Sequence, residues 1–192
     1  FCLSRGLGDV YKRQVQMVFL DMGVPQTKAK PKKADPDGDV TITDTPDPIF
    51  AKYNVDLYAD LKARLVAMGV PAKQIATIHE ATDDQKKAKL FSRVRSGDVR
   101  VIIGSSEKMG VGTNVQDRLI AMHHLDAPWK PAEVEQRDGR IVRQGNKNPN
   151  VRILRYVTER SFDAFMWQKL DTKSKFIGQV LSGAKGARHA ED

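Results

Sequence analysis

One short run of the chain combines arginines and a glutamine at a spacing suited to chemistry. In EQRDGRIVRQG, Gln136, Arg140 and Arg143 stand at positions i, i+4 and i+7, which would place all three on one face of a helix. Paired arginines can stabilise charge on a phosphoryl group in transfer, because each guanidinium offers several fixed donors and stays charged. Gly139 weakens a helix, which is tolerable where another group must come close. Taken alone, the run is more typical of a solvated face or a carboxylate clamp.

A second run follows an apolar stretch at residues 99–103. It reads GSSEKMGVGTNVQD over residues 104–117, with three glycines, two serines, a threonine and an asparagine. Such a loop can direct backbone N–H groups and hydroxyls at phosphate oxygens, because glycine lets the main chain approach closely. A flexible strand connection explains the composition equally well. A dinucleotide-binding glycine motif is disfavoured, since Val115 occupies the place of its third glycine.

The two runs together resemble a known family. QRDGRIVRQG is similar to motif VI of superfamily 2 helicases and Swi/Snf-type translocases, and it matches all five defining positions, Gln136, Gly139, Arg140, Arg143 and Gly145. The earlier run resembles motif V, in which Gly110, Gly112 and Asn114 fit the pattern G-x-G-x-N. VQMVFLD resembles motif IV and IATIHEATDDQKK the next family block. The resemblance covers about residues 15–182, with the helicase part of mobile-element methylase–helicase proteins as the nearest match.

This resemblance implies the second of two RecA-like domains that enclose ATP with Mg²⁺. The upstream domain would hold the phosphates and the magnesium, while this chain would supply Arg140 and Arg143, with Arg143 as the expected arginine finger. Gln136 would position the nucleotide. The expected nucleotide-binding residues are Gly110, Gly112, Asn114 and Gly139. The expected nucleic-acid-binding residues carry hydroxyls or a positive charge, which suit phosphate contacts: Ser105, Ser106 and Lys108.

Two motifs of a complete ATPase are missing from the chain. No glycine is followed by lysine, and no acidic D-E-x-x motif is present, so the phosphate loop and the magnesium-binding acids must come from elsewhere. We therefore expect the C-terminal half of an ATP-dependent DNA helicase or translocase, inactive in ATP hydrolysis by itself. Its expected partners are DNA, an upstream RecA-like domain and a fused methyltransferase domain. The alternative is a non-catalytic nucleic-acid-binding or regulatory module on the same fold.

The hydrophobic pattern around these runs predicts strands that alternate with helices. Strands are expected at residues 15–20, 75–79, 99–103, 119–125 and 151–157. Helices are expected near 53–68, 82–96 and 161–181, with a further one from Pro131. Thr82 is expected to cap the second helix, with Gln85 completing a capping box. The alternation predicts an α/β fold with a mostly parallel sheet, in which ligands bind beyond the carboxyl ends of the strands; the resemblance implies a RecA-like three-layer domain with a long C-terminal helix.

The chain divides into a leader, a domain and a closing helix. Residues 1–14 resemble translated sequencing-adaptor read-through and are expected to be non-native. Residues 15–160 form the expected helicase C-terminal domain, with an exposed loop or insertion at 24–48. Residues 161–192 form the expected closing helix and a truncated tail. Apolar residues of that helix recur at helical spacing and are expected to pack in the core: Phe162, Phe165, Met166, Phe176, Ile177, Val180 and Leu181.

Composition restricts the class of protein further. The 192 residues, 40% hydrophobic and 29% charged, suit one folded domain. The net charge of +8 favours a polyanionic partner. Cys2 is the single cysteine, which excludes a disulfide framework and a four-cysteine zinc site. No run approaches the ~18 apolar residues of a membrane span, so we expect a cytoplasmic protein without a membrane partner.

A metal site is weakly suggested by two adjacent histidines. His123 and His124 are followed closely by Asp126. Neighbouring residues of a strand point to opposite faces, so the two rings cannot easily share one ion. We expect ordinary core and surface positions here and no metal ligands.

Overall fold

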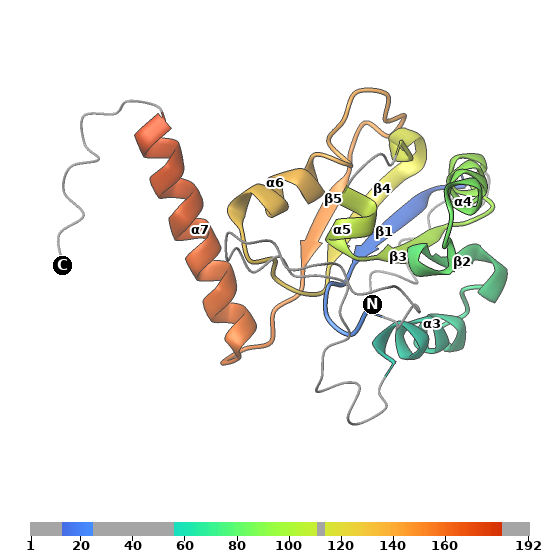
Figure 1. Ribbon diagram of the computed structural model, residues 1–192, viewed down its shortest axis with the longest axis horizontal. Coiled ribbons are helices and arrows are strands. Elements are labelled where there is room, and N and C mark those ends of the chain that lie inside the picture. The colour runs from blue at the N-terminus through green and yellow to red at the C-terminus, as the bar shows by residue number, and fades with distance from the viewer. Residues whose placement is uncertain (1–12, 25–55, 111–113, 182–192) are drawn as a thin grey trace.

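The computed structural model describes residues 13–24, 56–110 and 114–181. Nearly all of the expected leader and exposed loop, together with Gly112 and the tail 182–192, lies outside these residues. The described part is built on a five-stranded sheet in the order β2-β3-β1-β4-β5, with helices on both faces (Figure 1). The strands are β1 (Val15–Phe19), β2 (Ile75–Thr77), β3 (Val101–Gly104), β4 (Leu119–His124) and β5 (Arg152–Arg155).

All four strand pairings are parallel, as the alternating pattern predicts. β1 lies in the centre, and all five of its residues are buried, which suits a strand covered on both faces. Met17 of β1 stands beside Ile102 of β3 and Met122 of β4. Gly104 ends β3 where a side chain could not fit, since an added Cβ would lie 2.3 Å from Cγ2 of Ile78.

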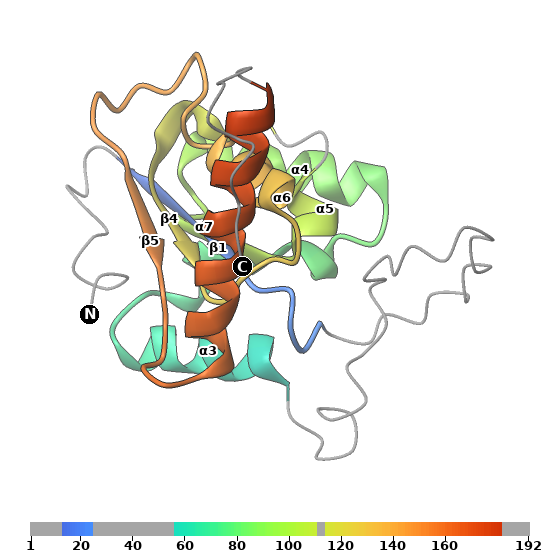
Figure 2. The same cartoon turned by 90° about the vertical axis from the view of Figure 1, so that its left-hand side faces the viewer.

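The helices form two layers, each with its own core. On one face, α3 (Leu57–Ala67) packs Tyr58 and Leu65 against the sheet. The other face carries α4 (Asp84–Ser96), α5 (Ser106–Gly110) and α6 (Pro131–Asp138), and α7 (Phe162–Leu181) lies outside α6 and β5 (Figure 2). Short 3₁₀ turns span Ala72–Gln74, Ile78–Glu80 and Gln116–Arg118. No helix among the described residues is long and apolar enough to cross a bilayer.

Two local predictions need correction. The strand expected at 75–79 ends at Thr77 and continues as a 3₁₀ turn. The cap of α4 is Asp83 rather than Thr82, because the Asp83 carboxylate accepts the N–H of Lys86 at 2.7 Å. The predicted end of α4 is confirmed: Gly97 caps it with a left-handed backbone, φ +80°.

The closing helix begins after Ser161, as predicted, but its apolar residues do not join the core. Phe162, Phe165, Phe176, Ile177, Val180 and Leu181 are 47–81% exposed, so the prediction of core packing is wrong for these six, and Met166 is half-buried. Only Leu170 of α7 is buried. The physical reason is position: α7 lies beside α6 and outside the sheet, so most of its circumference has no neighbour among the described residues.

Candidate functional site

The run that carries Arg140 and Arg143 is not one continuous helix. α6 ends at Asp138, and residues 139–145 follow as turns, so the prediction that Gln136, Arg140 and Arg143 share one helical face is wrong. Gly139 favours the break, because glycine is a poor helix former, and the next apolar residue, Ile141, is 1% exposed in the core. Gln136 is exposed on α6, and both arginines lie on the turn.

The turn nevertheless leaves the two arginines near enough for their charges to interact. Partial burial lowers the pKa of Arg140, and the positive charge of Arg143 lowers this pKa further. Arg140 is half-buried and Arg143 is exposed. Within the described residues, neither guanidinium forms an ion pair with a carboxylate. Two neighbouring cations without a counter-charge are suited to an added anion such as a phosphate.

Buried contacts hold this turn on its C-terminal side. The Asn146 amide Nδ2 donates to the backbone oxygens of Leu119 at 2.9 Å and Ile141 at 3.1 Å. The Gln116 amide donates to the backbone oxygen of Gln144 at 3.4 Å. The arginine turn, which we define as residues 139–145, is therefore fixed to the amino end of β4 through side chains outside it.

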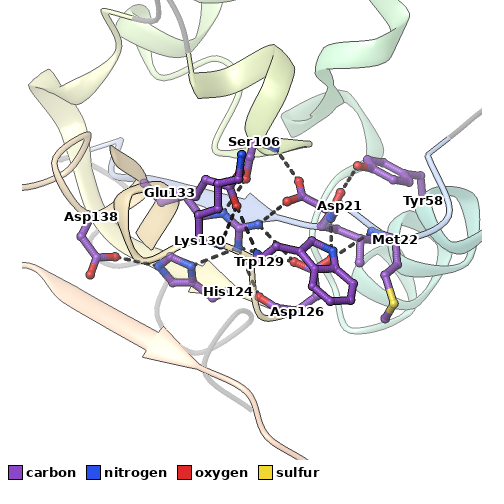
Figure 3. A network of polar contacts seen from close by, with 12 residues as sticks. Asp21, Met22, Tyr58, Ser106, His124, Asp126, Trp129, Lys130, Glu133 and Asp138 are labelled. Carbon is purple, nitrogen blue, oxygen red and sulfur yellow. Dashed lines mark hydrogen bonds and ion pairs between the residues drawn. The ribbon is translucent and has the colours of Figure 1, made fainter. Parts of the chain in front are cut away.

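On its N-terminal side, the turn is held by Arg137, a residue absent from the predicted site. The Arg137 side chain is 2% exposed and forms ion pairs with Asp21 and, at 3.4 Å, with Asp126. Its Nε donates to the Ser106 hydroxyl at 2.6 Å, and its Nη1 lies 3.3 Å from the His124 ring. Figure 3 shows Asp21, Ser106, His124 and Asp126 converging at this point. The sequence did contain a signal that could have indicated this site, because an aspartate follows each of two central strands: Asp21 follows β1 and Asp126 follows β4.

The two aspartates tie together the ends of three strands. The Asp126 carboxylate accepts the backbone N–H groups of Asp21 at 2.5 Å and Met22 at 2.9 Å. Asp21 in turn accepts the N–H of Ser106 at 2.6 Å. Burial raises the pKa of Asp126, and the charge of Asp21 raises this pKa further, although Arg137 opposes both. The carboxyl ends of β1, β3 and β4 thus share one buried ion network.

The network continues from Arg137 toward α7. His124 Nε2 lies 2.8 Å from Asp138 Oδ1, and Arg155 donates to the other oxygen of Asp138 at 2.9 Å. The Arg155 guanidinium lies 5.0 Å from the ring centroid of Trp167. Burial would raise the pKa of Asp138, but the contacts with His124 and Arg155 outweigh burial and lower it.

His123, the other of the two adjacent histidines, faces the side of β4 opposite to His124. His123 Nε2 lies 2.9 Å from the Gln16 amide oxygen, and its Nδ1 lies 2.9 Å from the Tyr156 hydroxyl. One neutral tautomer satisfies both contacts, with Nε2 donating and Nδ1 accepting. Burial is the main cause that lowers the pKa of His123 to about 4, and the electrostatic interaction with the neighbouring His124 adds to it. Both histidines are completely buried, and the described residues contain no group of side chains placed to hold a metal ion.

The residues predicted to bind nucleic acid lie at the carboxyl end of β3. Ser105 is 3% exposed, and its hydroxyl accepts the N–H of Lys108 at 3.5 Å. Ser106 is half-buried and contacts Asp21 and Arg137, whereas Lys108 is half-buried on α5. The serine hydroxyls therefore serve contacts within the domain.

The residues predicted to bind nucleotide are spread along the chain. Gly110 ends α5, Gly112 lies outside the described residues, and Asn114 is exposed, with its backbone oxygen accepting from Arg95 at 3.2 Å. Gly139 is exposed at the C-terminal cap of α6. Because Asn114 and Gly139 are exposed, both are accessible to a ligand.

Comparison with known proteins identifies the family to which the chain belongs. The helicase conserved C-terminal domain family matches residues 49–145, a stretch that runs from before α3 to the end of the arginine turn and makes up half of the chain. The chain belongs to the helicase conserved C-terminal domain family.

Relatives of this helicase C-terminal domain include a phage protein. The "Defense against restriction protein B" of Escherichia phage P1 is 32% identical over 104 residues, which are 54% of this chain and 5% of the relative. The chain therefore spans a small part of the length of that relative. The expected similarity to mobile-element methylase–helicase proteins stays a prediction.

A solved structure with a similar arrangement of strands and helices confirms the fold of the domain. The C-terminal part of the Fun30 ATPase domain has a TM-score of 0.56 at 16% identity, over 87% of this chain and 43% of that one. The Dbp5 C-terminal domain of S. cerevisiae, bound to Gle1 and IP6, has a TM-score of 0.47 at 15% identity, over 90% of this chain and 78% of the Dbp5 chain. With its parallel sheet and flanking helices, the chain has the RecA-like fold expected of a helicase C-terminal domain.

Proposed function

We propose that this chain is the C-terminal half of an ATP-dependent DNA helicase or translocase of superfamily 2, acting in the cytoplasm. Its ATP site would be shared with an upstream RecA-like domain. The observation that carries the proposal is the pair of arginines on one short turn, whose charges interact and which have no carboxylate partner among the described residues. A polyphosphate supplies the anion that this pair lacks.

Each predicted residue has a role in this proposal. Arg143, the more exposed arginine, extends to the phosphoryl group in transfer, and Arg140 neutralises charge beside it. Gln136, exposed on α6, positions the nucleotide. Gly110, Asn114 and Gly139 line this domain's side of the shared ATP site in the proposal, and the nucleotide-binding role of Gly112, which lies outside the described residues, rests on the motif alone.

Magnesium belongs to the other half of the site. Mg²⁺ is usually held by one or two carboxylates together with substrate phosphates. The described residues offer no cluster of acidic or histidine side chains for it, and the sequence lacks the acidic motif as well as the phosphate loop. The upstream domain would supply both, and the ATP phosphates would then lie between its phosphate loop and the arginine turn.

DNA is the nucleic acid that we propose this domain contacts. Lys108 lies on α5 at the carboxyl end of the sheet, beside Ser105 and Ser106, and the net charge of +8 favours a polyanion. Since the serine hydroxyls and the backbone N–H groups of Ser106 and Lys108 are engaged inside the domain, the proposed contact is made by the Lys108 side chain. A fused methyltransferase stays a prediction.

The proposal is tested by ATP hydrolysis with and without DNA. The purified 192-residue chain should hydrolyse ATP at the background rate, whereas the natural protein that carries it, with its upstream domain, should show DNA-stimulated hydrolysis. Robust turnover by the chain alone would overturn the shared site. DNA binding by the natural protein without any ATP hydrolysis would favour a non-catalytic binding module.

A further inference from the structure

Arg137 connects α5, where we propose DNA contact, with the arginine turn, where we propose ATP contact. Its backbone lies two residues before Gly139, the first residue of the arginine turn. Its guanidinium reaches α5 by donating to the Ser106 hydroxyl at 2.6 Å. It also pairs with Asp21, whose carboxylate accepts the backbone N–H of Ser106 at 2.6 Å. Two separate hydrogen-bonded paths therefore join α5 to the end of α6.

We propose that Arg137 is a positioning residue that couples DNA contact at α5 to the placement of Arg140 and Arg143. This inference rests on the proposed function. Together the guanidinium nitrogens contact three segments: Nε donates to Ser106, Nη2 donates to Asp21, and Nη1 donates to the backbone oxygen of Asp126 at 3.2 Å. Both Nη atoms also lie 3.4 Å from the Asp126 carboxylate. A movement of α5 must either carry Arg137 with it or break these contacts.

The surroundings of Arg137 favour transmission of such a movement. The side chain is 2% exposed, and its guanidinium carbon lies 5.0 Å from the centroid of the Phe19 ring. A close-packed interior absorbs small displacements poorly, so shifts pass between discrete arrangements. The arginine turn itself is pinned at its other end by Asn146. A displacement at Arg137 is therefore expected to change the turn between these two anchors.

Stability alone does not account for an arginine at this position. A buried ion pair is weak evidence for stability, because well-packed apolar residues often replace one without loss. The planar guanidinium can serve three segments at once, which the single ammonium of a lysine cannot do with the same geometry. Arg137→Lys therefore keeps the positive charge beside Asp21 and Asp126 but gives up part of the connection.

The test compares variants of the natural protein that contains this chain. Arg137→Lys and Asp21→Asn are measured beside Arg64→Lys, a matched control whose side chain is exposed and, in the described part of the chain, pairs only with its helix neighbour Asp60. The readouts are the melting temperature, the KM for ATP, the DNA affinity, and the ratio of DNA-stimulated to unstimulated ATP hydrolysis. For Arg137→Lys we expect the ratio to fall about tenfold, a typical strength for coupling between two sites. The KM for ATP and the DNA affinity should change by less than about threefold, and the control should match the wild type.

The outcomes separate this inference from the proposed function. An unchanged ratio in folded Arg137→Lys, or activities that fall only with the folded fraction, would overturn the coupling role. If Arg137→Lys does not fold, the Asp21→Asn variant tests the coupling role instead. This variant keeps a side-chain oxygen for the Ser106 N–H but weakens the ion pair with Arg137. It should also lower the ratio of DNA-stimulated to unstimulated ATP hydrolysis. A wild-type protein that shows no DNA-stimulated hydrolysis would overturn the proposed function itself.

Discussion

Arg137 and Arg140 stand three residues apart and have opposite electrostatic surroundings. Arg137 is 2% exposed and lies between the carboxylates of Asp21 and Asp126, whereas Arg140 is half-buried beside the positive charge of Arg143. The first arginine is balanced within the domain, and the second is balanced by no carboxylate among the described residues. One run of sequence thus contains both an arginine that is fixed inside the domain and the pair that we propose to bind an anion.

Ile141 is the residue of the arginine turn that is buried in the core, and shortening its side chain should destabilise the domain. Ile141 is 1% exposed, and Val142 beside it is 68% exposed. Ile141→Ala should lower the free energy of unfolding by about 2–5 kcal/mol, since it deletes buried methyl groups and leaves a cavity. Val142→Ala should change this free energy by less than about 0.5 kcal/mol. Urea denaturation measures both variants, and equal effects would contradict the burial of Ile141.

The stability of the domain should fall with acid partly because of His123. Its pKa is about 4 in the folded state against 6.5 when unperturbed, so the unfolded chain gains a proton between these values before the folded one does. This contribution is fully present above pH 6.5 and is lost as the pH falls toward 4. Between pH 7 and pH 5 it amounts to about 2 kcal/mol.

The comparison for His123 is an uncharged variant. His123→Gln should be less stable than the wild type at pH 7, because it loses the fitted ring contacts with Gln16 and Tyr156. Its free energy of unfolding should nevertheless fall by about 2 kcal/mol less than that of the wild type between pH 7 and pH 5. Parallel pH profiles for the two proteins would rule out His123 as the titrating group.

The apolar face of α7 should contribute little to folding. Phe176 is 52% exposed, whereas Leu170 on the same helix is 4% exposed. Leu170→Ala should lower the free energy of unfolding by about 2–5 kcal/mol, and Phe176→Ala by less than about 0.5 kcal/mol. Chemical denaturation of the two variants distinguishes them. A large loss for Phe176→Ala would mean that this face is covered in solution.

Much of the fold was predictable because its signals are local. The five residues of β1 are a continuous apolar-rich run, and such runs indicate strands buried on both faces of a parallel sheet. Gly97 marked the end of α4 for a local reason as well, since glycine adopts the left-handed backbone easily. The helical spacing of the α7 apolar residues was equally clear, yet spacing cannot tell whether a neighbour covers the face.

The site was harder to predict because it depends on contacts between distant segments. The motif drew attention to Arg140 and Arg143, but a helical period carried through Gly139 predicted the wrong backbone geometry for them. The partners of Arg137 lie 116 residues away at Asp21 and 11 residues away at Asp126. Only the parallel order of β1 and β4 brings these two aspartates together, and no local pattern encodes that meeting.

The most direct test of the proposed role of the arginine turn is the ATP turnover of Arg143→Ala in the natural protein. It should be measured with nucleotide affinity and beside Arg152→Ala, which removes an exposed arginine of β5. We expect kcat to fall by about 10³-fold or more, as for other arginine fingers, with nucleotide affinity largely kept and with the Arg152 variant unaffected. Arg140→Ala should also lose most of its turnover. An unchanged kcat in folded Arg143→Ala would contradict the proposal that this turn completes an ATP site.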